Sequence, residues 1–232
     1  MIIEVSKTRL VSGETLATVL PCLPAKGTPV IMCHGAEGAV NGATAWTGYP
    51  TRTKVPAACM SERRKVFSPE LAGNMAWGNA DAQARMDEVF SYVGSEKVIL
   101  ACQSMGGTTG LTWAANNPNK VAGIVLVIPV INLTDLATSS YAGDINAAYG
   151  GQYSPVTHAA YNPLARAQAG AFNGIPIQCW YGKTDTLCKA VDAEEFIRLS
   201  PDAIAKPMTG GHEESVVSNI SAAEIAQFIR NL

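Results

Sequence analysis

A serine, an aspartate and a histidine occur along the chain in an order that suits nucleophilic catalysis. Ser104 lies in a Cys-Gln-Ser-Met-Gly run at residues 102–106, which differs by one residue from the Gly-x-Ser-x-Gly nucleophile elbow. Asp185 and His212 follow in the chain order that elbow enzymes use. A serine hydroxyl is a poor nucleophile at neutral pH, so it needs a base to remove its proton and an acid to orient that base. Residue types and order therefore predict a triad of serine, aspartate and histidine.

Each of these residues also has a simpler interpretation. Ser104 could cap the helix that is predicted to begin at Met105, since serine is a favoured N-cap residue. Asp185 is of a type common in turns, and His212 lies in a glycine loop. Because all three follow predicted strands and occur in triad order, we favour the catalytic interpretation.

Two other acidic residues compete with Asp185 for the role of orienting His212. Asp135 follows the strand after the elbow strand, and Glu213 is adjacent to His212. A neighbour in sequence is poorly placed to reach Nδ1 of the imidazole while Nε2 faces the serine. Asp185 follows a later strand in a tight Gly-Lys-Thr-Asp turn, which would hold its carboxylate at the sheet edge. We therefore favour Asp185.

The segments around Ser104 predict the strand, turn and helix that an elbow needs. The apolar run at 98–101 is typical of a strand buried on both faces of a parallel sheet, and a predicted helix at 105–115 and strand at 121–130 follow it. Alternation of strands and helices along the chain predicts an α/β fold with a mostly parallel, doubly wound sheet. The other predicted elements are an antiparallel hairpin at 2–11 and 15–20, strands at 30–33, 65–70, 176–181 and 203–206, and helices at 54–63, 79–93, 192–199 and 215–231.

The alternation breaks at residues 132–170, which are rich in Ser, Tyr, Gly and Asn and show no strong period. Irregular stretches longer than ~15 residues are uncommon in compact domains and often act as lids. We therefore expect a single domain over 1–232, with its core at 1–131 and 171–232 and a cap at 132–170. Three tyrosines of this segment are candidates for lining a pocket: Tyr141, Tyr149 and Tyr153.

Composition argues for a soluble protein without a nucleic-acid partner. Of the 232 residues, 47% are hydrophobic and 16% are charged, and the formal net charge is −2, so no basic surface is expected. The longest apolar run, 121–131, is too short to span a membrane and contains Pro129. Residues 1–5 lack the basic start of a signal peptide, which predicts a cytoplasmic location.

The six cysteines are scattered singly along the chain, without the spacing of a zinc site or of a small disulfide scaffold. Cys33, Cys102 and Cys179 fall on predicted strands, where we expect small buried hydrophobic side chains. The sequence therefore indicates no metal site.

These features together resemble the α/β-hydrolase superfamily, over nearly the whole chain. The resemblance implies Ser104 as nucleophile, His212 as general base and then acid, and Asp185 as its orienting carboxylate. It also implies an oxyanion hole formed by the backbone N–H groups of Met105 and Ala36, a residue of the small-residue loop after the strand at 30–33. The sequence departs from the family pattern at the first glycine of the elbow, where Cys occurs. A serine rather than an aspartate at the nucleophile position argues against a dehalogenase.

The function implied is that of a carboxylic-ester hydrolase, resembling an esterase or lipase, which acts through an acyl-enzyme. Its substrate would be a small-molecule or lipid ester, and no metal or organic cofactor is implied. Thioesterase, acyltransferase and peptidase activities are variants that the sequence does not separate, and it leaves the oligomeric state open.

A narrower resemblance, to hydrolases encoded near tail genes of actinobacterial phages, rests on short runs. It would make the substrate an ester or lipid of the host cell envelope, and the protein virion-associated. The alternative function on this basis is a virion structural or host-adhesion module that keeps the fold without turnover. The complete serine, aspartate and histidine set argues against that alternative. The runs are those at 68–73, 77–79, 128–130, 146–150 and 209–212.

Overall fold

The computed structural model of the protein describes residues 4–36, 46 and 49–232. Within these residues eight strands form one sheet in the order β1-β2-β4-β3-β5-β6-β7-β8. The predicted loop at 34–38 lies partly outside the described residues, which stop at Ala36 and resume at Trp46. The strands are β1 (Glu4–Arg9), β2 (Thr15–Leu20), β3 (Val30–Cys33), β4 (Val66–Pro69), β5 (Val98–Gln103), β6 (Val121–Val127), β7 (Ile177–Gly182) and β8 (Ala203–Met208).

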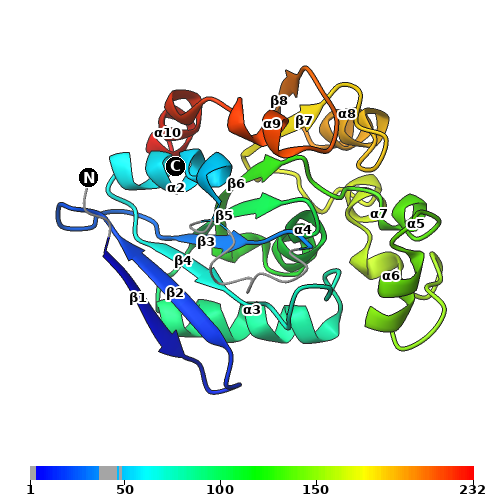
Figure 1. Ribbon diagram of the computed structural model, residues 1–232, viewed down its shortest axis with the longest axis horizontal. Coiled ribbons are helices and arrows are strands. Elements are labelled where there is room, and N and C mark those ends of the chain that lie inside the picture. Colours follow the sequence, from blue (N-terminus) through cyan, green and yellow to red (C-terminus); the bar gives the residue numbers. More distant parts are fainter. Residues whose placement is uncertain (1–3, 37–45, 47–48) are drawn as a thin grey trace.

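The first two pairings of the sheet, β1 with β2 and β2 with β4, are antiparallel, and every later pairing is parallel. β1 and β2 form the hairpin that projects at one end of the sheet (Figure 1). β5 lies between β3 and β6, and Cys33 of β3 pairs in register with Cys102 of β5. The predicted mostly parallel, doubly wound sheet is confirmed, with β5 near its centre.

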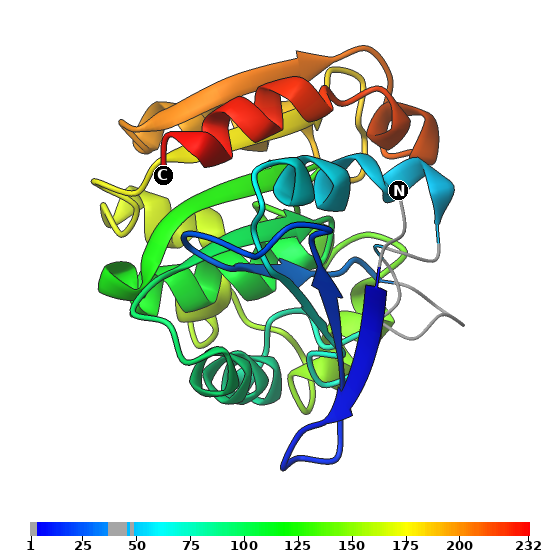
Figure 2. The ribbon, with the colours of Figure 1, turned by 90° about the vertical axis from the view of Figure 1, so that its left-hand side faces the viewer.

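Helices cover both faces of this sheet. Side chains of the central strands alternate between two hydrophobic clusters: Ile31 and Leu100 face one, and Val30 and Ile99 face the other. Figure 2 shows α3 and α4 on one side of the strands, with α2 and α10 on the other. The principal helices are α2 (Lys54–Ser61), α3 (Ala80–Val93), α4 (Gly106–Asn116), α8 (Ala190–Leu199), α9 (Glu214–Ser218) and α10 (Ala222–Arg230), with 3-10 turns η2 (Pro50–Arg52) and η3 (Pro118–Lys120).

Residues 132–170 are more regular than the sequence predicted. They form four short helices that gather beside α4 and α8 (Figure 1). The helices hold four to seven α-helical residues or a single 3-10 turn, so none is long enough to show a helical period in the sequence. A third hydrophobic cluster joins this segment to the core through Met105 and Trp77, which pack with Leu133 and Ile145. The helices are α5 (Leu133–Leu136), α6 (Ala142–Ala148), η4 (Ala159–Tyr161) and α7 (Pro163–Gln168).

The prediction of one helix at 215–231 is wrong, because this segment forms two helices, α9 and α10, with a short non-helical stretch between them. Ser221 caps α10, and its side chain accepts a hydrogen bond from the backbone N–H of Glu224 at 3.3 Å. The apolar positions of both helices, such as Val217 and Ile225, are buried on the same face of the sheet. The apolar period therefore runs through the break, and only the Ser-x-x-Glu capping sequence marks it.

Among the described helices, none has the length and apolarity to cross a membrane.

Asn79 joins the core to the segment at 132–170. Its Oδ1 accepts a hydrogen bond from the backbone N–H of Ala82 at 3.0 Å, which caps α3. Its Nδ2 donates to the carbonyl of Ala148, the last residue of α6, at 2.8 Å. One side chain thus caps the first turn of α3 and bonds to the last residue of α6, although Asn79 and Ala148 lie 69 residues apart in sequence.

We predict that Asn79→Ala lowers the free energy of unfolding by about 1–2 kcal/mol, because it removes an N-cap and leaves a carbonyl without its donor. Asn79→Asp keeps the cap acceptor and loses only the donor to Ala148, so its loss should be smaller. Urea unfolding followed by circular dichroism measures both. Equal losses in the two variants would contradict the two-part role of Asn79.

Candidate active site

Ser104 occupies a sharp turn between β5 and α4. Its φ is +48°, a conformation that non-glycine residues rarely adopt and that surrounding contacts must maintain. The backbone N–H of Ser104 donates to the carbonyl of Val127 at 3.1 Å, and its carbonyl accepts from the N–H of Val130 at 2.9 Å. The neighbouring strand β6 and the residues after it therefore hold the turn in place.

Gly106 allows α4 to begin immediately beside β3. A Cβ at this position would lie 2.2 Å from the carbonyl oxygen of Cys33 and 2.8 Å from that of His34. Because these are backbone atoms, no side-chain rotation could make room for a larger residue. The turn therefore requires glycine two residues after the serine.

Cys102 stands where the family pattern has glycine, and Gly110 accommodates it. A Cβ at position 110 would lie 2.3 Å from the sulfur of Cys102, so the absence of a side chain on α4 creates the space for this thiol. Burial, together with a hydrogen bond to Cys33, raises the pKa of Cys102 well above its ordinary value. Cys102 is thus a neutral packing residue beneath the turn. The expected burial of Cys33, Cys102 and Cys179 is confirmed.

The structure brings the three predicted residues into one hydrogen-bonded chain. The Oγ of Ser104 lies 2.9 Å from Nε2 of His212, and Nδ1 of His212 lies 2.9 Å from Oδ2 of Asp185. The other carboxylate oxygen of Asp185 accepts from the backbone N–H groups of Leu187 and Cys188 at 2.9 and 2.8 Å. The side chain of Asp185 is 1% exposed and that of His212 is 18% exposed. A buried, fully hydrogen-bonded carboxylate thus supports an imidazole that reaches the pocket.

Two loops that are distant in sequence meet closely to form this chain. Gly182 ends β7, and a Cβ there would lie 2.6 Å from the carbonyl oxygen of Gly210 in the histidine loop. The backbone N–H of Thr184 donates to the same carbonyl at 3.0 Å. The absence of a side chain at Gly182 therefore allows the loop that carries Asp185 to touch the loop that carries His212.

The competing residues have other partners. Asp135 forms an ion pair with Lys189, with 2.8 Å between Nζ and Oδ2. Glu213 turns back to its own loop, where its Oε1 lies 3.4 Å from the backbone nitrogen of Gly211. The ring of His34 lies between the carbonyls of Gly35 and Glu70, at 2.7 and 2.6 Å, and His158 accepts from the N–H of Ser154 at 3.0 Å.

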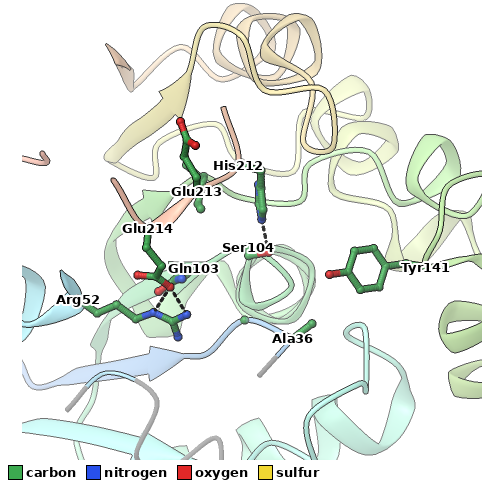
Figure 3. A pocket seen from close by; sticks show the side chains of 10 residues that line it. Ala36, Arg52, Gln103, Ser104, Tyr141, His212, Glu213 and Glu214 are labelled. Carbon is green, nitrogen blue, oxygen red and sulfur yellow. Dashed lines mark hydrogen bonds and ion pairs between the residues drawn. The ribbon is translucent and has the colours of Figure 1, made fainter. Parts of the chain in front are cut away.

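A pocket of about 160 Å³ opens over Ser104 and His212 (Figure 3). Of the three tyrosines predicted to line it, Tyr141 does so, and its ring packs edge-on against Trp77 at 5.0 Å between centroids. Tyr149 and Tyr153 instead contact each other, with 5.2 Å between their centroids. The lining residues are Gly35, Ala36, Arg52, Gln103, Ser104, Ile128, Tyr141, His212, Glu213 and Glu214.

An ion pair between Arg52 and Glu214 lies at the rim of this pocket and was not predicted from the sequence. Nε of Arg52 donates to Glu214 at 2.9 Å, and the hydroxyl of Thr51 donates to the second carboxylate oxygen at 2.5 Å. Burial raises the pKa of Glu214, but these hydrogen bonds outweigh it and bring the pKa below its ordinary value. The partners lie 162 residues apart, so no local pattern signals the pair.

One group of described residues has the side-chain types of a metal site. Ligand atoms of Asp185, Cys188 and His212 lie within 4.8 Å of one another. Burial and the neighbouring carboxylates of Asp185 and Asp192 raise the pKa of Cys188 well above its ordinary value, so its thiol is neutral at physiological pH. Both carboxylate oxygens of Asp185 already accept hydrogen bonds. A neutral thiol and a carboxylate whose oxygens are both hydrogen-bonded are poor metal ligands, so these three residues fit a hydrogen-bonded network better than a metal site.

Comparisons with known proteins agree with this architecture. A family model described as serine aminopeptidase, S33, matches residues 75–151. The structure of FphF, a fluorophosphonate-binding serine hydrolase of Staphylococcus aureus, superposes with a TM-score of 0.78 and 18% identity, over 98% of both chains. S-formylglutathione hydrolase of the same organism superposes with a TM-score of 0.74 and 17% identity, also over 98% of both chains.

A curated relative, 2-hydroxy-6-oxo-2,4-heptadienoate hydrolase of Pseudomonas putida, is 28% identical over 109 residues. That match covers 44% of this chain and 37% of the relative, so it spans well under half of the relative's length. The fold is that of the α/β hydrolases. The family model and the structural neighbours support a place in that superfamily.

We predict that Gly110→Ala destabilises the protein by about 1–3 kcal/mol, because the added methyl group overpacks against the buried sulfur of Cys102. Cys102→Ala removes that sulfur, so the double variant should recover most of the loss. The coupling free energy from urea unfolding of the two single variants and the double variant measures the contact. Strictly additive losses would show that Cys102 does not occupy the space left by Gly110.

Proposed function

We propose that the protein is a serine hydrolase that cleaves small carboxylic esters through an acyl-enzyme on Ser104. The observation that carries the proposal is the hydrogen-bonded chain from Ser104 through His212 to Asp185, at 2.9 Å for each link. These distances lie within the range that a nucleophile, its base and the base's orienting acid need. A serine that merely capped α4 would need neither partner.

In the proposed reaction, His212 removes the proton of Ser104 through Nε2 as the serine oxygen attacks the ester carbonyl carbon. Asp185 holds the ring with Nδ1–H toward its carboxylate and stabilises the imidazolium that forms. His212 then donates the proton to the departing alcohol. A water molecule attacks the acyl-enzyme by the same route and releases the carboxylic acid.

The negative charge on the carbonyl oxygen requires hydrogen-bond donors, which we assign to the backbone N–H groups of Met105 and Ala36. Met105 directly precedes α4, whose N-terminus carries positive partial charge toward the pocket. Ala36 follows β3 and lines the pocket beside Ser104 (Figure 3). Donors from two different elements would thus converge on one oxygen.

We assign residues 132–170 as the cap of a single domain, because Tyr141 from this segment reaches the pocket while its hydrophobic cluster joins the core. A pocket of about 160 Å³ is smaller than the usual ~300–1,000 Å³ of drug-sized ligand sites, which favours a short acyl chain over a long lipid. An envelope ester of small size would satisfy both the pocket and the phage resemblance. A virion module without turnover would have no use for the connected triad.

We predict that a fluorophosphonate probe modifies Ser104 in the wild-type protein and that Ser104→Ala abolishes the labelling. The activated hydroxyl would attack the phosphorus, whereas a helix-capping hydroxyl would not. Mass spectrometry of the digested protein locates the adduct. Absence of an adduct on folded wild-type protein would favour the non-catalytic alternative.

We predict that Asp185→Asn lowers kcat for p-nitrophenyl acetate by about 10³- to 10⁴-fold, since the amide no longer fixes the imidazole tautomer. Asp135→Asn is the matched control, because Asp135 is paired with Lys189 away from the imidazole and its loss should leave kcat nearly unchanged. Circular dichroism confirms that both variants fold. The assignment of the acid fails if the two variants behave in the opposite way.

A further inference from the structure

Gln103 is a polar residue at the end of an otherwise apolar strand. It is the last residue of β5, directly before Ser104, and the residues before it on this strand are buried hydrophobic side chains. Only 4% of Gln103 is exposed, yet it lines the pocket. A methionine of similar length would fill the same space without burying an amide.

The amide oxygen of Gln103 has no hydrogen-bond partner among the described residues, although it is buried. Leaving a buried acceptor unsatisfied costs stability, so such atoms are rare and require an explanation. Gln103 lines a pocket beside the proposed nucleophile, so a substrate donor that reaches this buried oxygen would satisfy it.

The charged groups beside Gln103 form an ion pair, because Arg52 donates to Glu214. The hydroxyl of Thr51 also donates to Glu214, and the carboxylate of Glu213 points away from Ser104 (Figure 3). Figure 3 shows Gln103 with the Arg52–Glu214 pair on one side of Ser104 and Tyr141 on the other. Because the guanidinium of Arg52 is already paired with the carboxylate of Glu214, this side of the pocket favours neutral substrate groups over anionic ones.

We infer that Gln103 is a specificity residue whose amide oxygen accepts a hydrogen bond from a hydroxyl or amino group of the substrate. The preferred substrates are then small esters that carry such a donor near the scissile bond, rather than plain alkyl esters. This inference rests on the proposed esterase function of Ser104. It adds the polarity of the substrate, which the triad itself does not determine.

The test compares esters that differ by one donor. On the acyl side, p-nitrophenyl butyrate is compared with the p-nitrophenyl esters of β-hydroxybutyrate and β-aminobutyrate. On the alcohol side, ethyl butyrate is compared with the butyrate monoester of ethylene glycol, and acid release is followed with a pH indicator. The two arms show whether the donor lies on the acyl or the alcohol part, and the acyl pair separates hydroxyl from ammonium.

We predict that at least one donor-bearing ester exceeds its plain counterpart in kcat/KM by about tenfold, the effect of one well-placed hydrogen bond. In Gln103→Met that ratio should fall to about one. The same variant should have a higher Tm than wild type without substrate, because it no longer buries an unpartnered amide.

Ser200→Ala is the matched control. The Oγ of Ser200 is also buried without a hydrogen-bond partner among the described residues, but Ser200 follows α8 and does not line the pocket. Its substitution should raise Tm and leave the substrate ratio unchanged. Equal cleavage of plain and donor-bearing esters by the wild type, with Ser104 still labelled by fluorophosphonate, overturns the inference alone. No cleavage of any ester and no labelling overturn the proposed function as well.

Discussion

The strained turn at Ser104 is the constraint on which the site depends. A φ of +48° directs the chain from β5 straight into α4, which brings the helix N-terminus to the end of the central strand. The turn persists because neighbouring backbone bonds hold Ser104 and because Gly106 lets α4 touch β3. Beneath the turn, the sulfur of Cys102 fills the space that the missing side chain of Gly110 leaves. Its backbone strain is therefore supported by packing on several sides.

The proposed acid, Asp185, and the proposed base, His212, are positioned by the same kind of close backbone contact. The carboxyl ends of parallel strands lie along one edge of the sheet, so the loops after β5 and β7 open on the same side. Contact between Gly182 and Gly210 brings the histidine loop against the aspartate turn. Two backbone N–H groups then hold Asp185, which in turn orients His212 toward the serine.

Local sequence determined the elements and the identity of the residues that meet. Short apolar runs specified strands buried on both faces, and the helical period of residues 79–93 specified α3. Small residues around Ser104 indicated a tight turn, because only they fit where a helix starts against a strand. These features depend on residues that are close together in the chain, so they can be predicted from the sequence. Ser104, Asp185 and His212 could be identified in the same way, because each directly or closely follows a predicted strand.

Tertiary structure decided what depends on residues distant in sequence. The periodic pattern of 215–231 concealed the break at Ser221, because both helices bury the same face. The helices of 132–170 were not predicted, because short helices derive their stability from packing rather than from propensity. The pair of Arg52 and Glu214 joins η2 to α9 across 162 residues, and the missing partner of the Gln103 oxygen likewise depends on the folded surroundings. The sequence thus indicated the proposed reacting groups, whereas the polarity of the pocket around them depends on contacts between residues that are distant in the chain.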